Sequence, residues 1–409
     1  MTMLLASSVS PVADPNPRPT GLADSGQCAD DVLADLDALT IDDHAYDSTV
    51  INSICSDPHP LGTQVLAQHA HRNAGDNRIF PSIRRCEAAV TSMLGDLCGL
   101  PTAAGVSTSG GTEANLLAVL AAVMRWRDGG GTGRVPVLIP DNAHFSFDKI
   151  LNVLPIRQVR VPTNTEQRVD VEAALATLQQ DLALVVLTAG TSECGAVDDI
   201  PSVARVAHEQ GVPVHVDAAT GGFLVPFARE LGRALPEFGF AAEGVTSVTI
   251  DPHKYGGAPI PSGHLLFRDA ADRDRLRVSS HYRGTADHYG LLGTRPGAAV
   301  LATYAVLRHL GRDGYLQRTA QLFAMVDQLV AGIEARGLTR AFTPDLTVVG
   351  ITVPDPHDAM RRLEHEGLVA SVSHRLGVLR LVVHWQHTAP DLTRVLDRIA
   401  AIAGDQGGR

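Results

Sequence analysis

Two short segments place reactive side chains at the points where predicted strands end. In SVTIDPHKYGG (residues 247–257), an apolar strand runs into an acid, a proline and a histidine, and Lys254 follows. In VPVHVDAATGG (212–222), Asp217 ends a second apolar strand. Ligands of parallel α/β sheets bind outside the carboxyl ends of the strands, where a desolvated lysine can act as a nucleophile. A buried acid there needs a partner, because an unpaired charge is costly. Taken singly, the lysine also fits a surface charge and the acid a turn cap.

A glycine turn and a histidine extend this pattern to four segments. STSGGTEAN (107–115) predicts a turn that opens a helix, where the N–H groups of Gly110, Gly111 and Thr112 suit a phosphate. DNAHFSFDK (141–149) places His144 just past another strand, and its flat ring could stack on a cofactor ring or serve the structure alone. Because all four segments follow strands in order, they predict one site for a phosphorylated, ring-shaped cofactor.

The elements that must position these residues alternate between strand and helix. Apolar runs predict strands at 103–109, 135–140, 156–162, 182–188, 212–218, 245–251 and 263–268. Helical spacing is found at 113–126, from about residue 144, and at 171–180 and 201–210. This alternation predicts an α/β fold with a mostly parallel sheet covered on both faces. After Pro296 the pattern changes to a long helix (298–335) and a smaller α+β unit with strands at 347–353 and 379–385 and helices at 357–366 and 389–403.

Composition narrows the class of protein. The 409 residues are 44% hydrophobic, which is enough for a large buried core. A net charge of −11 with no basic block argues against a nucleic-acid or anionic-membrane partner. Five scattered cysteines without metal-ligand spacing predict free thiols and no metal site. No apolar run reaches about 18 residues and the first residues lack a basic signal region, so we expect a cytoplasmic protein. We also expect residues 1–50 to form a partly disordered N-terminal arm.

With these motifs in place, the chain resembles the group II amino-acid decarboxylases, fold-type I enzymes that use pyridoxal 5′-phosphate (PLP). SGGTEAN, NAHFSF, HVDAATGG and DPHK are similar to that family's phosphate, ring-stacking, pyridine-nitrogen and lysine segments, in the same order. The similarity runs from about residue 53 to the end and is greatest to a short branch that decarboxylates tyrosine or aspartate. It implies a large PLP-binding domain at 51–297, a small domain at 298–409 and a homodimer with shared active sites.

The resemblance also implies a role for each matching residue. Lys254 would hold the cofactor as a Schiff base, and Asp217 would keep the pyridine nitrogen protonated so that the ring serves as an electron sink. His144 would stack on the ring, and Tyr282, in the loop 278–290, would protonate the substrate's α carbon after CO2 has left. The cofactor-binding set it implies is Gly110, Gly111, Thr112, His144, Ser192, Asp217, Ala219, His253, Lys254 and Thr294, the last reaching the neighbouring subunit's phosphate.

The substrate is the least determined feature of the sequence. Ser192 and Glu193 stand where relatives often have two threonines, and Asp57 also departs from the nearest branch. Arg84, Arg85 or Arg380 could pair with a substrate carboxylate, although Arg380 could equally serve the small domain's own packing. These arginines and an aromatic content of only 4% favour aspartate giving β-alanine over tyrosine giving tyramine.

Two other functions stay open at this point. A PLP-dependent carbon–carbon (aldehyde) lyase related to the phosphosphingosine lyases would share His144 and the GTRPG segment. A catalytically idle PLP-binding protein is the other alternative, and the intact lysine, acid and histidine argue against it.

Overall fold

The computed structural model describes residues 21–407 apart from 23, 77 and 283–286. The chain divides into two units, residues 1–45 and 46–409. The described part of the first unit contains helix α1 (Ala29–Leu39), which begins where the Cys28 thiol accepts the Asp31 N–H.

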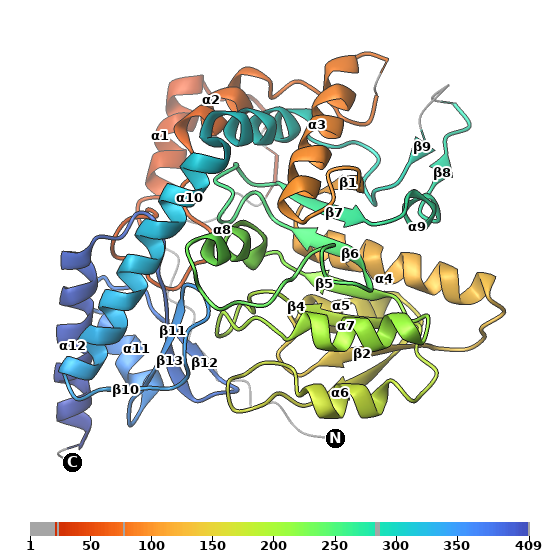
Figure 1. The fold of residues 1–409 in the computed structure, drawn as a ribbon. Helices are drawn as coiled ribbons and strands as arrows, with labels where there is room; N and C mark the ends of the chain where they lie inside the picture. Colours follow the sequence, from red (N-terminus) through yellow and green to blue (C-terminus); the bar gives the residue numbers. More distant parts are fainter. Residues whose placement is uncertain (1–20, 23, 77, 283–286, 408–409) are drawn as a thin grey trace. The chain divides into compact units, whose positions relative to one another are not determined.

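A seven-stranded sheet is the framework of the larger part of the second unit (Figure 1). Its order is β1-β7-β6-β5-β4-β2-β3, and β3, β2, β4, β5 and β6 run parallel to one another. β7 is antiparallel to both β6 and β1. The predicted α/β class with a mostly parallel sheet is therefore confirmed. The strands are β1 (Ala104–Thr108), β2 (Val135–Pro140), β3 (Ile156–Val161), β4 (Leu184–Thr188), β5 (Val214–Asp217), β6 (Val245–Ile250) and β7 (Gly263–Phe267).

Helices cover both faces of this sheet because its central strands are apolar on both sides. In β4, Val185 and Leu187 join one hydrophobic cluster, to which α7 contributes. Leu184 and Val186, which point the other way, join a second cluster with α4 and α5. The helices of this part are α2 (Pro60–Gln68), α3 (Pro81–Leu97), α4 (Gly111–Asp128), α5 (Ser146–Val153), α6 (Val171–Thr177), α7 (Ile200–Glu209), α8 (Val225–Glu230) and α9 (Ala270–Asp274), with a 3-10 turn, η1, at Gly221–Phe223.

The C-terminal part has a smaller antiparallel sheet of order β10-β11-β13-β12 (Figure 1). It follows α10 (Gly297–Ala335), the predicted long helix, which is broken at Gly311 where φ is 56°. α12 contacts both α10 and α11. A domain boundary at residue 297 stays a prediction. The remaining elements are β8 (Val278–Ser279), β9 (Asp287–His288), β10 (Thr339–Arg340), β11 (Val348–Thr352), α11 (Pro356–Glu364), β12 (Ser371–Ser373), β13 (Val378–Val382) and α12 (Ala389–Gly407).

The arrangement brings four strand ends to one edge of the large sheet. β2, β4, β5 and β6 are mutually parallel, so the residues that follow them emerge on the same side. Within the described ranges, no helix is long and apolar enough to span a bilayer.

Candidate active site

A cavity of about 410 Å³ opens at this edge. Nine of the residues singled out in the sequence line it: Gly110, Gly111, Thr112, His144, Ser192, Asp217, Ala219, His253 and Lys254. The segments therefore converge in space as their order along the strands predicts. Seven further residues also line the cavity: Ser109, Asn115, Phe145, Thr188, Gly190, Thr220 and Asp251.

The glycine turn between β1 and α4 forms one wall. A Cβ on Gly110 would lie 2.9 Å from the His253 ring, and a Cβ on Gly111 would lie 3.0 Å from Asp251 Oδ2. Any side chain at these two positions would therefore force its neighbours to shift. The turn also opens the 18-residue helix α4, whose first N–H groups and dipole favour an anion.

Asp217 ends β5 with its side chain buried. Its Oδ1 accepts the Ala219 N–H at 3.1 Å, and its Oδ2 accepts from Asn115 Nδ2 at 2.7 Å. These two donors hold the carboxylate plane while the side chain still lines the cavity. Asp217 can thus accept a further hydrogen bond from a cationic N–H group in the cavity.

His144 lies in the loop between β2 and α5. Its Nδ1 accepts the Ser146 N–H at 3.2 Å, which orients the imidazole. Burial lowers the pKa of His144 below the usual histidine value, partly offset by the charge of Asp217. A neutral flat ring therefore forms part of the cavity wall.

Lys254 and His253 share one acidic neighbour. Asp251 Oδ2 lies 3.4 Å from Lys254 Nζ, 3.6 Å from His253 Nε2 and 3.1 Å from the Gly111 nitrogen that donates to it. Asp251 Oδ1 is buried and has no hydrogen-bond partner among the described residues. Burial also lowers the pKa of His253, whose Nδ1 accepts the Ser262 N–H. The ammonium is thus held beside the glycine turn by a buried carboxylate.

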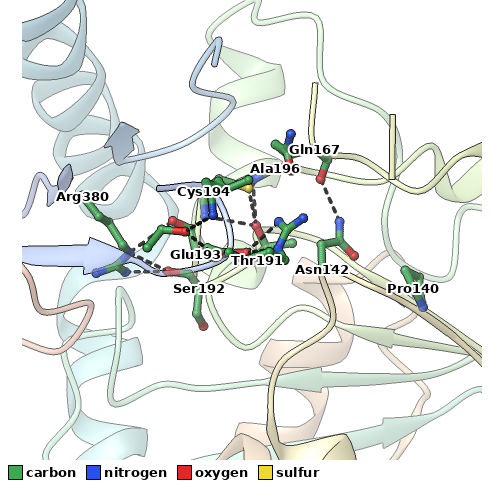
Figure 2. A network of polar contacts seen from close by, with 12 residues as sticks. Pro140, Asn142, Gln167, Thr191, Ser192, Glu193, Cys194, Ala196 and Arg380 are labelled. Carbon is green, nitrogen blue, oxygen red and sulfur yellow. Dashed lines mark hydrogen bonds and ion pairs between the residues drawn. The ribbon is translucent and has the colours of Figure 1, made fainter. Parts of the chain in front are cut away.

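Ser192 belongs to a turn that the small sheet holds in place (Figure 2). The Ser192 carbonyl accepts from Arg380 Nη2 at 2.5 Å and from Arg380 Nε at 3.0 Å. Glu193 accepts from Ser373 Oγ at 2.5 Å and pairs with Arg375 at 2.6 Å. Arg380 Nη1 donates to the Asn52 carbonyl. Of the two readings of Arg380, the structure favours the one in which it ties elements of the protein together.

Several predicted residues lie outside the cavity. The Tyr282 side chain is 82% exposed, beside the undescribed segment 283–286, and Thr294 is also exposed. Arg84 lines a different cavity of about 570 Å³, together with Arg295 and Tyr289, and Arg85 is exposed. This single chain does not bring these side chains to Lys254.

Among the seven unpredicted lining residues, Asn115 and Asp251 have side chains that hydrogen-bond to predicted site residues. Asn115 lies one turn into α4, and its contact with Asp217 spans 102 positions. Asp251 lies in the quoted DPHK segment, but its contact with Gly111 spans 140 positions. Their polarity within apolar surroundings was the available signal, since buried polar groups are nearly always bonded.

The residues present fit PLP. The glycine turn suits its phosphate, Asp217 suits its ring nitrogen and Lys254 suits its aldehyde. His144 and Ala219 both line the cavity, where the flat imidazole and the small alanine suit an aromatic ring. The chain has only two lysines, Lys149 and Lys254, and Lys254 alone lines the cavity within the described residues.

Comparisons with known proteins agree with this fit. Residues 44–344 match the model of the pyridoxal-dependent decarboxylase conserved domain. The chain is 37% identical to a probable L-tyrosine/L-aspartate decarboxylase of Methanothermobacter thermautotrophicus over 82% of this chain and 92% of that protein. It is 39% identical to a protein of the same description from Methanopyrus kandleri, over 90% of this chain and 99% of that one. Among solved structures, the sphingosine-1-phosphate lyase of Burkholderia pseudomallei aligns with a TM-score of 0.85 at 25% identity, over 95% of this chain and 92% of that one.

Proposed function

The chain belongs to the pyridoxal-dependent decarboxylase family, and we propose that its substrate is L-aspartate, which it converts to β-alanine and CO2. That it is a PLP-dependent amino-acid decarboxylase of fold-type I follows from the family and the relatives. The lyase alternative shares the fold, but the more similar relatives are decarboxylases.

The polar lining of the cavity supports L-aspartate over L-tyrosine as the substrate. Of the described residues that line it, Phe145 is the single large apolar side chain, and it is 57% exposed. A pocket for an aromatic side chain is normally lined by apolar and aromatic groups. The names of both relatives include aspartate as well as tyrosine, and the polar lining favours the smaller, acidic one.

Each wall of the cavity has a part in the proposed mechanism. PLP, when bound, supplies an electron sink for the pair of electrons left at the α carbon when CO2 departs. Asp217 would keep the ring nitrogen protonated, and Lys254 would anchor the cofactor through its aldehyde. The turn at Gly110 and Gly111 would bind the phosphate, and the neutral ring of His144 would pack against the cofactor ring without adding charge. The α carboxylate leaves, and a proton replaces it at the same carbon.

We also propose that the enzyme is a cytoplasmic homodimer whose subunits share active sites. The exposed positions of Tyr282 and Thr294, away from their own chain's cavity, support this arrangement. A second copy would bring Thr294 to the neighbouring phosphate and Tyr282 to the neighbouring substrate. The five cysteines are free thiols, as suits a reducing compartment.

The substrate proposal predicts a clear order of rates. Purified enzyme with added PLP should release CO2 from L-aspartate with a kcat/KM at least about 10-fold above that for L-tyrosine, because one desolvated contact is worth a factor of this size. Rates are measured for aspartate, glutamate and tyrosine, with β-alanine identified by mass spectrometry. Faster turnover of tyrosine would overturn the choice of aspartate and leave the reaction class intact.

Tyr282→Phe tests the source of the proton. A positioned general acid contributes about 10²- to 10⁴-fold, so amine formation should fall by at least about 10²-fold while the KM for substrate stays within a few-fold. CO2 release should then exceed amine formation, with aldehyde formed by reaction with O2 making up the difference. Tyr289→Phe, a change of the same size seven positions away, serves as the control. Wild-type amine release from Tyr282→Phe would transfer the role to Tyr289 or His144.

A further inference from the structure

Behind Asp217, three buried residues form a chain of hydrogen bonds that the catalytic roles above do not use. Asn115 on α4 touches the carboxylate, His215 on β5 touches Asn115, and Ser247 on β6 touches His215. The exposed fractions are 1% for Asn115, 0% for His215 and 4% for Ser247. The chain thus links residues of three elements, α4, β5 and β6, and ends at one acidic side chain.

The Asp217 carboxylate, at one end of this chain of hydrogen bonds, determines the direction of every hydrogen bond in it. Asp217, as a carboxylate, can only accept, so the amide nitrogen of Asn115 faces it at 2.7 Å. The second hydrogen of that nitrogen points to Ser146 Oγ at 3.1 Å. The amide oxygen of Asn115 then faces His215 Nε2 at 3.1 Å, and this nitrogen must carry the hydrogen.

His215 passes the same polarity to Ser247. Burial lowers the pKa of His215 to about 4, so the ring is neutral and has one N–H and one acceptor nitrogen at neutral pH. With the hydrogen on Nε2, Nδ1 accepts the Ser247 hydroxyl at 2.9 Å. The chain therefore donates in one direction, from Ser247 through His215 and Asn115 to Asp217, and no atom in it is left unpartnered. Hydrogen bonds aligned in this way strengthen one another.

We propose that Asn115 and His215 are positioning residues that set how strongly Asp217 attracts the proton it shares with the cofactor's ring nitrogen. A carboxylate that accepts hydrogen bonds holds its charge and binds a proton weakly. The directed chain therefore leaves that proton on the ring nitrogen. The inference rests on PLP as the cofactor and is independent of the choice of aspartate as substrate.

Removing a donor from the chain should move the proton from the ring nitrogen towards Asp217. The test uses holoenzyme loaded with PLP labelled with 15N in the ring, without substrate, and reads the ring-nitrogen chemical shift at one fixed pH. In Asn115→Leu and His215→Phe, the shift should move towards that of unprotonated pyridine. The dissociation constant of PLP should rise by about 10- to 100-fold, the scale for losing a hydrogen bond to a buried charge.

Two further variants separate positioning from simple packing. His215→Gln can still donate to Asn115 and accept from Ser247, so its ring-nitrogen shift should stay near that of the wild type. His264→Phe is the matched control, since His264 is also a buried neutral imidazole of the same sheet, bonded to Thr91 and 1% exposed. It should lower the melting temperature and leave the 15N shift unchanged.

The outcomes that would overturn the proposal are specific. A wild-type 15N shift and a PLP dissociation constant within twofold of wild type, in folded Asn115→Leu and His215→Phe, would show that the chain only fills space. An equally large change in the 15N chemical shift in His264→Phe would show that the effect is a general loss of packing. If Asn115→Leu and His215→Phe do not fold, Ser247→Ala provides the test. It removes one hydroxyl and should move the shift less but in the same direction, and an unchanged shift would refute the directed chain.

Discussion

Lys254→Ala should give a folded protein that lacks the visible absorbance of the holoenzyme and turns over its substrate about 10⁴- to 10⁶-fold more slowly. Losses of that size follow the removal of a group that bonds covalently during catalysis. Lys254 follows the end of β6, lines the cavity and lies 3.4 Å from a buried carboxylate of Asp251. Alanine cannot form the covalent attachment, so PLP would be held by the remaining walls alone. Absorbance spectra and CO2 release measure the two effects.

The second lysine of the chain provides a control for this prediction. Lys149 is the other lysine of the chain, and its Nζ lies 4.7 Å from the centroid of the Phe145 ring at the cavity wall. Lys149→Ala should therefore keep the absorbance and most of the activity. Borohydride reduction followed by peptide mass mapping should place the PLP label on the peptide containing Lys254 in the wild type. A label on Lys149, or retained absorbance in Lys254→Ala, would show that the attachment site is misassigned.

Asp217→Ala should lower turnover by about 10²- to 10⁴-fold with the fold intact. Breaking a buried ionic pair costs about 3–5 kcal/mol, which corresponds to that range of rates. The variant leaves the Asn115 amide and the Ala219 N–H without their acceptor, so a lower melting temperature is also expected. Initial rates of CO2 release at saturating PLP measure the catalytic loss separately from weaker cofactor binding.

Two comparison variants assign this loss to charge at the site. Asp217→Asn keeps the side-chain shape and removes the charge, so it should lose nearly as much activity as alanine. Asp345→Ala removes another buried acid, which pairs with Arg168 at 2.5 Å outside the cavity. It should lower the melting temperature while turnover stays within a few-fold. Near-normal rates in both Asp217 variants would remove Asp217 from the mechanism.

The sequence predicted most of the large sheet because its strands are short apolar runs that alternate with helices. Residues 135–140 and 156–162, for example, correspond to β2 and β3 almost residue for residue. Periodicity could not predict that β7 runs antiparallel to its neighbours, because strand direction depends on pairing partners. It also gave no warning of the break in α10 at Gly311, a single glycine within a long helical pattern.

The site was predictable to the extent that its residues follow strand ends. Nine of the expected residues meet in the cavity for that reason. Asn115 was missed because its importance depends on Asp217, with which it shares no local pattern. Tyr282 and Thr294 were assigned by resemblance to roles that one chain alone does not place, and those roles remain predictions.

The turn that contains Ser192 is attached to the small sheet by hydrogen bonds and an ion pair. Arg380 on β13 binds the main chain of Ser192 (Figure 2). Ser373 on β12 and Arg375 just beyond it bind the side chain of Glu193. A displacement of these two strands would therefore pull on this part of the cavity wall. These contacts couple the position of the small sheet to this part of the cavity wall. Cavity closure on a ligand would then be transmitted to β12 and β13, and stiffening those strands would narrow the range of shapes that the cavity can accept.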